Sequence, residues 1–160
     1  MPHARKSHDR EHDAPDEPNE ADHDEETRLV ANAKKVALFS LGVAYQKYMT
    51  ALEDQQEVLA GLTDIMMNAF AMESVLLRTQ KLALQKKGEV AAEMCSVFLR
   101  EAMETVESAA RTVLAASSEG DALRTNLAVL KRFTKFELVN AIGLRRKIAA
   151  RLLEADRYIV

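Results

Sequence analysis

The histidines are the first residues to consider for chemistry, and all four lie near one end of the chain: His3, His8, His12 and His23. They stand among carboxylates, and this mixture of side chains can bind metal ions. Only His8 and His12 have the i,i+4 spacing that places two ligands on one face of a helix. Pro15 and Pro18 would interrupt a helix that continued beyond this pair. We therefore expect a plain solvated tail, with weak, adventitious metal binding as the alternative.

After His23 the sequence offers little for catalysis. Cys95 is the only cysteine, and no histidine in the remaining chain could act as its base. A small buried apolar side chain is the better interpretation of Cys95. Di-iron sites in helical bundles need Glu-x-x-His pairs, and none exists here because no histidine comes after His23. A glycine-rich phosphate-binding loop is also absent, because the glycines are isolated from one another. We expect no catalytic residue, no cofactor-binding residue and no metal ligand in this chain.

A basic cluster near the other end is the remaining candidate site. We call four of its cations the basic patch: Arg145, Arg146, Lys147 and Arg151. Basic amphipathic helices bind membrane surfaces or nucleic acid. Aromatic side chains that could stack on bases are sparse here, so nucleic acid ranks last. A solvated face ranks first, and a docking or membrane-facing surface ranks second.

The composition bounds the kind of protein. The chain has 160 residues, 48% of them apolar, which suits one domain with a core. Residues 1–26 carry ten acidic and three basic side chains, a net of −7 in a chain whose total is −3. The remainder is therefore mildly basic. The acidic start has no apolar segment typical of a signal peptide. We expect a cytoplasmic protein, with peripheral contact to the inner face of the membrane left open.

The distribution of helix breakers predicts an all-α fold. All three prolines lie in the first 18 residues, and no alternating strand pattern comes after them. Residues 1–24 are predicted to be a disordered acidic tail, and 25–160 a helical bundle. The first helix should begin near Asp22. Capping boxes at Thr50, Ser118 and Thr134 should begin the second, fourth and fifth helices, and the third should run from Glu89 to Ser117. Short connections then predict an up-and-down antiparallel bundle of four to five helices.

Apolar residues at three- and four-residue steps predict the inward faces. On the first helix these are Val30, Ala33, Ala37, Leu41, Ala44 and Tyr48. On the second they are Val58, Leu62, Ile65, Ala69, Met72 and Leu76. On the third they are Ala91, Cys95, Phe98, Ala102, Val106, Ala109 and Val113. On the last they are Leu138, Ala141, Ile148 and Leu152.

Two residue types leave alternatives open. The helical methionines, Met49, Met66, Met67, Met72, Met94 and Met103, either fill the core or line an adaptable apolar groove, and their spacing favours the core. Gly42, Gly61 and Gly143 lie inside predicted helices. Each is either required for close helix approach or merely tolerated.

Three stretches together resemble a known family. They are VALFSLGVAYQKY (36–48), LTDIMMNAFAMESVLLRTQKL (62–82) and LRRKIAARLLEADRY (144–158). Their order and spacing are similar to the C-terminal helical extension of acyl-CoA dehydrogenases of the very-long-chain type, over residues 25–160. These are packing patterns, so no catalytic or cofactor residue is carried over.

The resemblance implies a parent enzyme that is FAD-dependent and introduces a double bond between the α and β carbons of a fatty acyl-CoA. In that family the glutamate base and the flavin contacts come from three preceding domains, and nothing here resembles them. The extension packs on that core and is thought to help in membrane association or partner docking. This chain would then need no cofactor of its own.

These observations leave three hypotheses. The leading one is a detached or truncated C-terminal domain of an acyl-CoA dehydrogenase, inactive alone, that docks on the core domains. The second is a free-standing helical adaptor that self-associates through an apolar seam. The third is a membrane-surface protein that uses the basic patch. None of the three requires nucleic acid.

Overall fold

The computed structural model describes residues 20–85 and 89–156. In these ranges the chain forms five α-helices and one short 3-10 helix, with no strand. They are α1 (Glu20–Tyr48), η1 (Met49–Asp54), α2 (Gln56–Leu84), α3 (Glu89–Ser117), α4 (Gly120–Phe133) and α5 (Ala141–Ala155). The all-α prediction is confirmed. The predicted tail falls mostly on residues 1–19, which lie outside the described residues, and α1 begins two residues before Asp22.

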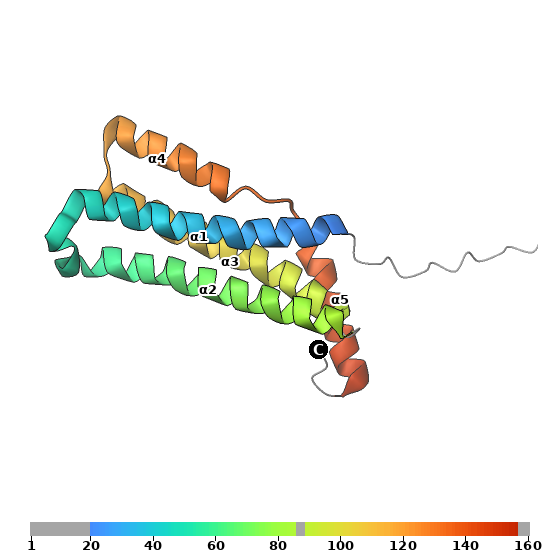
Figure 1. The fold of residues 1–160 in the computed structure, drawn as a ribbon. Coiled ribbons are helices and arrows are strands. Elements are labelled where there is room, and N and C mark those ends of the chain that lie inside the picture. The colour runs from blue at the N-terminus through green and yellow to red at the C-terminus, as the bar shows by residue number, and fades with distance from the viewer. Residues whose placement is uncertain (1–19, 86–88, 157–160) are drawn as a thin grey trace, which may run out of the picture.

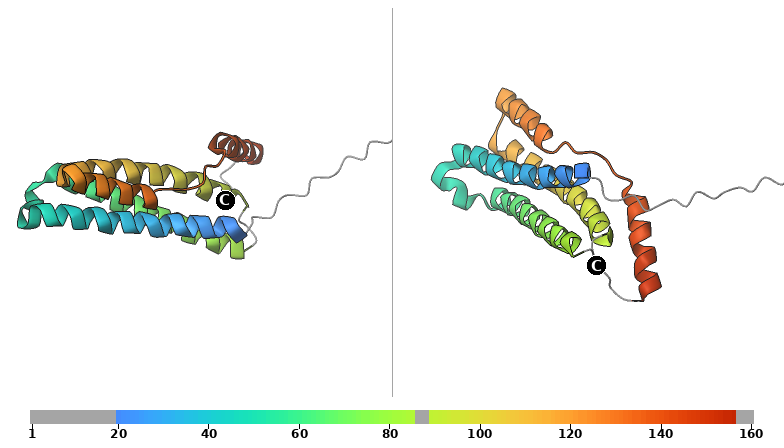
Figure 2. Two further views of the ribbon diagram at one scale, coloured as in Figure 1. Left: turned by 90° about the horizontal axis from the view of Figure 1, so that it is seen from above. Right: turned by 45° about the vertical axis from the view of Figure 1, so that its right-hand side comes forward.

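Among the three long helices α2 runs antiparallel to α1 and α3, and each of the three contacts the other two (Figure 1). The shorter α4 returns along α1 and α3. A non-helical strap, residues 134–140, then leads to the opposite end of the bundle. There α5 lies across the long helices and packs on α3 (Figure 2). The fold is thus a three-helix bundle with two shorter helices added at different places.

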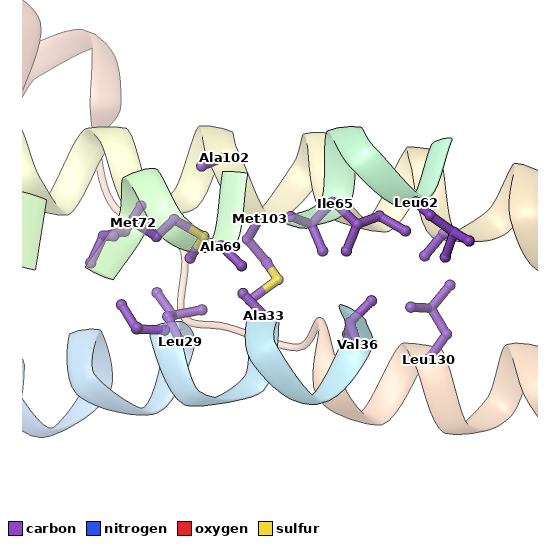
Figure 3. Packing of buried hydrophobic residues seen from close by; sticks show 14 of the residues in the cluster. Leu29, Ala33, Val36, Leu62, Ile65, Ala69, Met72, Ala102, Met103 and Leu130 are labelled. Carbon is purple, nitrogen blue, oxygen red and sulfur yellow. The ribbon is translucent and has the colours of Figure 1, made fainter. Parts of the chain in front are cut away.

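The core forms where the inward faces of α1, α2, α3 and α4 meet (Figure 3). All six residues predicted for the second helix are buried. The stripe on the third helix is also correct, with Phe98 and Ala109 only partly covered. On α1 the phase differs slightly, because Leu29, Val36 and Ser40 are buried while Leu41 is 38% exposed. The heptad-like pattern therefore predicted the faces of the long helices well.

The three capping boxes were wrong. Thr50 lies inside η1, and α2 begins at Gln56 after Gln55, which makes no side-chain cap. The Ser118 hydroxyl donates to the carbonyl of Leu114 at 2.7 Å, and Glu119 precedes α4 instead. In each case the hydroxyl group, or the backbone of the residue that carries it, belongs to the element before the predicted helix. The capping-box sequence is therefore present, but the hydrogen bonds of a capping box do not form.

The end of the chain departs most from the prediction. Thr134 ends α4, and its hydroxyl donates to the carbonyl of Leu130 at 3.2 Å. The last helix begins seven residues later, where Asn140 accepts a bond from the Gly143 amide at 3.0 Å. Leu138, predicted to be inward, lies in the strap and is 87% exposed. Residues 134–140 thus form a connection where the sequence pattern predicts a helix.

Two of the internal glycines have distinct explanations. A Cβ on Gly61 would stand 2.8 Å from Cγ2 of Val113, so α2 and α3 approach too closely for alanine. A Cβ on Gly42 would meet nothing within 4 Å. Close approach therefore explains Gly61, and tolerance explains Gly42.

Candidate functional site

The basic patch lies on α5, and part of it faces the bundle. Arg145 pairs with Glu101, and Lys147 pairs with Glu93, both on α3. Arg146 is exposed, and Arg151 is half-buried. Because at least two of the four cations meet carboxylates of the same chain, they help to hold α5 on α3. The patch has fewer unpaired charges for an outside partner than the sequence suggested.

A cavity of about 470 Å³ lies under α5, between that helix, α2 and α3. Its apolar walls include Val75 and Leu82 of α2, Met94 and Phe98 of α3, and Ile148 and Leu152 of α5. Arg78, Glu101 and Arg145 also line it. Ile148 and Leu152, predicted to be inward, thus face a cavity and not a closed core.

A second apolar surface, which we call the outer seam, runs along α1 and α2. It consists of Leu38, Leu41, Tyr45, Met66, Phe70 and Leu77. Lys34 of α1 pairs with Glu73 of α2 on this side of the molecule. The α1 residues come after Lys34 by four, seven and eleven positions, and those of α2 lie three, four and seven positions from Glu73. Helical periodicity therefore places them on the same face as the ion pair.

The methionines divide between the core and these surfaces. Met72 and Met103 are fully buried, as the core interpretation predicted. Met94 lines the cavity, while Met49, Met66 and Met67 are exposed. Core filling was therefore right for two of the six, and the groove alternative fits Met94 better.

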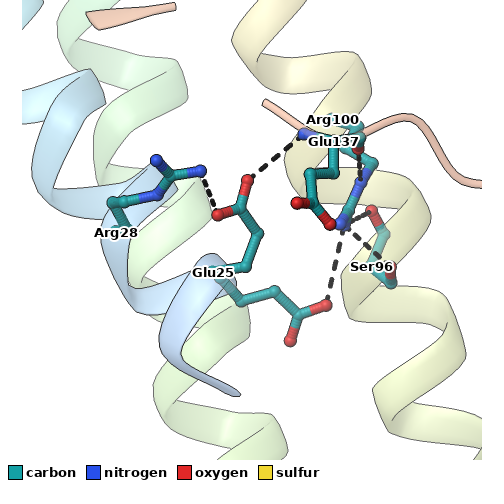
Figure 4. Close-up of polar contacts among 6 residues, drawn as sticks. Glu25, Arg28, Ser96, Arg100 and Glu137 are labelled. Atoms are coloured by element: carbon teal, nitrogen blue, oxygen red, sulfur yellow. Dashed lines mark hydrogen bonds and ion pairs between the residues drawn. The ribbon is translucent and has the colours of Figure 1, made fainter. Parts of the chain in front are cut away.

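A buried polar cluster fixes the strap and the start of α1 to α3 (Figure 4). The Nε of Arg100 donates to the carbonyl of Glu137 at 2.9 Å, and its Nη1 donates to the Ser96 hydroxyl at 2.8 Å. Nη1 also lies 3.7 Å from Oε1 of Glu26. Arg100 and Glu26 are only 8% and 6% exposed. This cluster positions α5, since the strap that carries α5 is held by Arg100.

Cys95 is fully buried, as predicted. Burial and the nearby Glu26 carboxylate raise its pKa to about 11, against weaker opposing effects of a Thr79 hydrogen bond and Arg100. A thiol with such a pKa is a poor nucleophile near neutral pH. Within the described ranges, no group of three or more His, Cys, Asp or Glu side chains could hold a metal ion. The four histidines were not tested, because their side chains lie outside the described residues.

The described helices include one, α2, that is long and apolar enough to cross a membrane by length and composition. Its inward face is the centre of the core, from Val58 to Leu76. The core helix of a bundle can have the same length and composition. The useful point is that α2 is apolar on two sides, toward the core and along the outer seam.

Comparison with known proteins decides the family. A family model described as "Acyl-CoA dehydrogenase, C-terminal domain" matches residues 32–132, from α1 to α4. This chain belongs to that family. The match omits α5 and the whole strap, so the family model covers most of the bundle core but not the basic patch or the α5 wall of the cavity.

Two relatives support the assignment to the acyl-CoA dehydrogenase C-terminal domain family. A "Probable acyl-CoA dehydrogenase" of Bacillus subtilis (strain 168) is 39% identical over 149 residues, which cover 91% of this chain and 25% of that protein. A crystal structure of acyl-CoA dehydrogenase complexed with FAD from Bacillus anthracis is similar with a TM-score of 0.81 and 40% identity. That match covers 84% of this chain and 24% of the other. The chain thus spans about a quarter of the length of these acyl-CoA dehydrogenases.

Sequence reasoning on this acyl-CoA dehydrogenase C-terminal domain missed Arg100, Glu26 and Arg78. A signal existed for the first two. Arg100 precedes the buried Met103 by three residues, and Glu26 precedes the buried Leu29 and Val30 by three and four. Charges at inward phase on two neighbouring helices indicate a buried pair. Arg78 had no such signal, because its role depends on where α5 crosses the bundle.

Proposed function

We propose that this chain is the C-terminal helical part of a cytoplasmic, FAD-dependent acyl-CoA dehydrogenase of the very-long-chain type, acting in fatty acyl-CoA oxidation. In this proposal it is a docking and stability module without activity of its own. Its partner is the remaining three quarters of such an enzyme. The family membership supports the parent enzyme, and the outer seam is the observation that carries the docking role.

The outer seam has the character of a surface that is covered in the complete protein. Leu38 and Phe70 are each 73% exposed, and Tyr45 is 54% exposed. Monomeric soluble proteins rarely leave such side chains contiguous, and larger exposed apolar patches mark interaction sites. A helix that is apolar on both sides, such as α2, is typical of a position inside a larger assembly. Aromatic residues and Met are also enriched at the centres of interfaces.

The residues that the structure describes do not fit FAD, which supports a flavin site elsewhere in the parent enzyme. Pyrophosphate binding uses free backbone amides at a helix N-terminus or a glycine-rich loop. The cavity is lined by residues within helices, and its walls are mostly aliphatic. A further support is that the Bacillus anthracis relative, described as a complex with FAD, has three quarters of its length outside the match.

The test is co-purification. This chain, carrying an affinity tag, is co-expressed with the Bacillus subtilis relative truncated before its matching segment. We expect the truncated enzyme to be retained together with its flavin. Phe70→Glu, which places a charge in the outer seam, should abolish retention, and Arg146→Glu, on the exposed side of α5, should not.

Three outcomes would contradict this proposal. One is that the wild-type chain does not retain the truncated enzyme. Another is that Arg146→Glu disrupts retention as strongly as Phe70→Glu does. The third is that the chain alone purifies with stoichiometric flavin or oxidises an acyl-CoA in the presence of an electron acceptor.

The same seam also favours a second candidate, a self-associating adaptor. Two antiparallel helices with an apolar outer face can pair with a second copy about a twofold axis. Sedimentation of the chain alone separates the two cases. A dimer that Phe70→Glu converts to a monomer, together with no retention of the truncated enzyme, favours the adaptor.

A further inference from the structure

The contact of α5 with the bundle is less complete than that of α4. α5 has no buried residue, and its apolar Ile148 and Leu152 are half-buried on the cavity wall. By contrast, the equally short α4 buries Leu130 to 1% exposure. The space under α5 opens to solvent, and the apolar side chains that line it keep exposed surface whose burial by a ligand would be favourable. The space under α5 is therefore an incompletely filled apolar site.

The attachment of α5 explains how this space stays open. Among the contacts that bind it are the ion pairs Arg145–Glu101 and Lys147–Glu93 at its inner side, and the strap held by Arg100 leads to its start. Its backbone packs on α3 and does not approach α2 closely. The two walls on α2 and α5 are thus held apart by polar contacts with α3.

The charged residues that line the cavity indicate which head group an occupant would carry. Arg145 is already paired with Glu101. Arg78 lines the same cavity from α2, and within the described part of the chain it has no ion-pair partner. The lining residues carry two cations and one anion, so the site has an excess positive charge. A guanidinium beside an apolar wall binds a carboxylate by two charge-assisted hydrogen bonds.

The volume of the cavity limits the size of the apolar tail that a ligand could place there. A cavity of about 470 Å³ lies in the lower part of the range of small-molecule sites, roughly 300–1,000 Å³. The lining of aliphatic side chains with Met94 and Phe98 suits a flexible hydrocarbon chain. The limited volume favours one chain over two. We propose that the cavity between α2, α3 and α5 binds a single-chain amphiphile with a carboxylate head, with its tail under α5 and its head on Arg78.

Isoleucine methyl groups offer a site-specific test on the full chain. The sequence has four isoleucines, at positions 65, 142, 148 and 159. Ile148 lines the cavity, Ile65 is in the core, and Ile142 is 62% exposed outside it. Titration of methyl-labelled protein with dodecanoate below its micelle concentration should shift Ile148 saturably and leave Ile65 and Ile142 unmoved. The absence of a saturable Ile148 shift would overturn the proposal.

Variants test the head and the tail separately. Arg78→Gln should weaken dodecanoate binding at least tenfold and leave dodecanol binding within twofold, while the matched Arg146→Gln on α5 should change neither. Ala149→Trp, which fills the cavity, should abolish both, with helical circular dichroism confirming the fold. Equal loss in Arg78→Gln and Arg146→Gln would mean non-specific charge attraction. Tighter binding of dodecyl phosphate than of dodecanoate would overturn the carboxylate assignment.

Discussion

At the scale of single residues, the most consequential side chain is Arg100. It joins three separate elements, since it bonds to Ser96 in its own helix, to the strap at Glu137 and to Glu26 of α1. Buried ion pairs are not necessarily stabilising overall, but removal of one partner leaves an uncompensated buried charge. The effect of a substitution here should therefore exceed that of any surface ion pair.

We predict that Arg100→Met lowers the free energy of unfolding by about 3–5 kcal/mol, because it breaks a buried ion pair with Glu26 and the hydrogen bond that holds the strap. Replacing both partners, Arg100→Met with Glu26→Gln, should recover part of the loss. The control is Arg124→Met, which removes an exposed pair with Asp121 at 2.8 Å and should cost at most about 1 kcal/mol. Urea denaturation of the three variants measures this. Similar effects of Arg100→Met and Arg124→Met would show that the cluster is not buried as described.

Gly61 of α2 and Gly42 of α1 form a matched pair that tests the close approach of α2 to α3. Gly42→Ala should stabilise the protein by about 0.5–1 kcal/mol, because alanine is the better helix former and the added methyl meets open space. Gly61→Ala should destabilise it, because the methyl would overlap Val113, and overpacking costs about 1–3 kcal/mol. Thermal melting of both variants gives the comparison. A stabilising Gly61→Ala would mean that α2 and α3 are further apart.

Cys95 should report on opening of the core. With a pKa of about 11 and full burial, it should react with a thiol reagent at pH 8 only when the bundle unfolds. The unfolded thiol ionises near 9.0, so its contribution to stability is complete below that pH and falls as the pH rises from about 9 to about 11. Cys95→Ala should lose this part of the alkaline slope. Rapid labelling of folded protein at pH 8 would contradict the buried placement.

At the scale of the helices, the sequence predicts faces better than ends. The stripe Val58–Leu62–Ile65–Ala69–Met72–Leu76 is correct because burial of a long helix is decided by many residues in one phase. Helix ends depend on single hydrogen bonds, and these can be redirected. Thr134 has the spacing of a cap but bonds backward to Leu130, while Asn140 caps the last helix. The strap could not be predicted, because Arg100 binds it from a helix distant in sequence.

The phase of α2 can be tested with two positions on different faces of this helix. Ile65→Ala should lower the free energy of unfolding by about 2–5 kcal/mol, from lost transfer energy and the cavity left behind. Phe70→Ala, at a side chain 73% exposed, should cost much less in the isolated chain. The denaturant midpoints of the two variants give the answer. A larger loss for Phe70→Ala would place the wrong face of α2 in the core.

At the scale of the whole molecule, the outer seam and the cavity are formed by different sets of helices. The outer seam lies on α1 and α2, within the range matched by the family model, whereas the cavity also needs α5, which lies outside that range. From the sequence, only the side of each surface that borders the core could be predicted. Periodicity shows which residues leave the core, but the position of α5 across the bundle end is set by Glu93, Glu101 and Arg100 on α3.

The most direct test of the docking and stability role is the melting curve of the partner. In a mixture of this chain with the truncated Bacillus subtilis relative, flavin fluorescence released on unfolding reports on that partner alone, if this chain carries no flavin. We predict that wild-type chain at micromolar excess raises the partner's melting temperature by several degrees, because binding to the native state stabilises it by mass action. Phe70→Glu should leave it unchanged. An unchanged melting temperature with wild-type chain, or an equal rise with Phe70→Glu, would contradict docking through the outer seam.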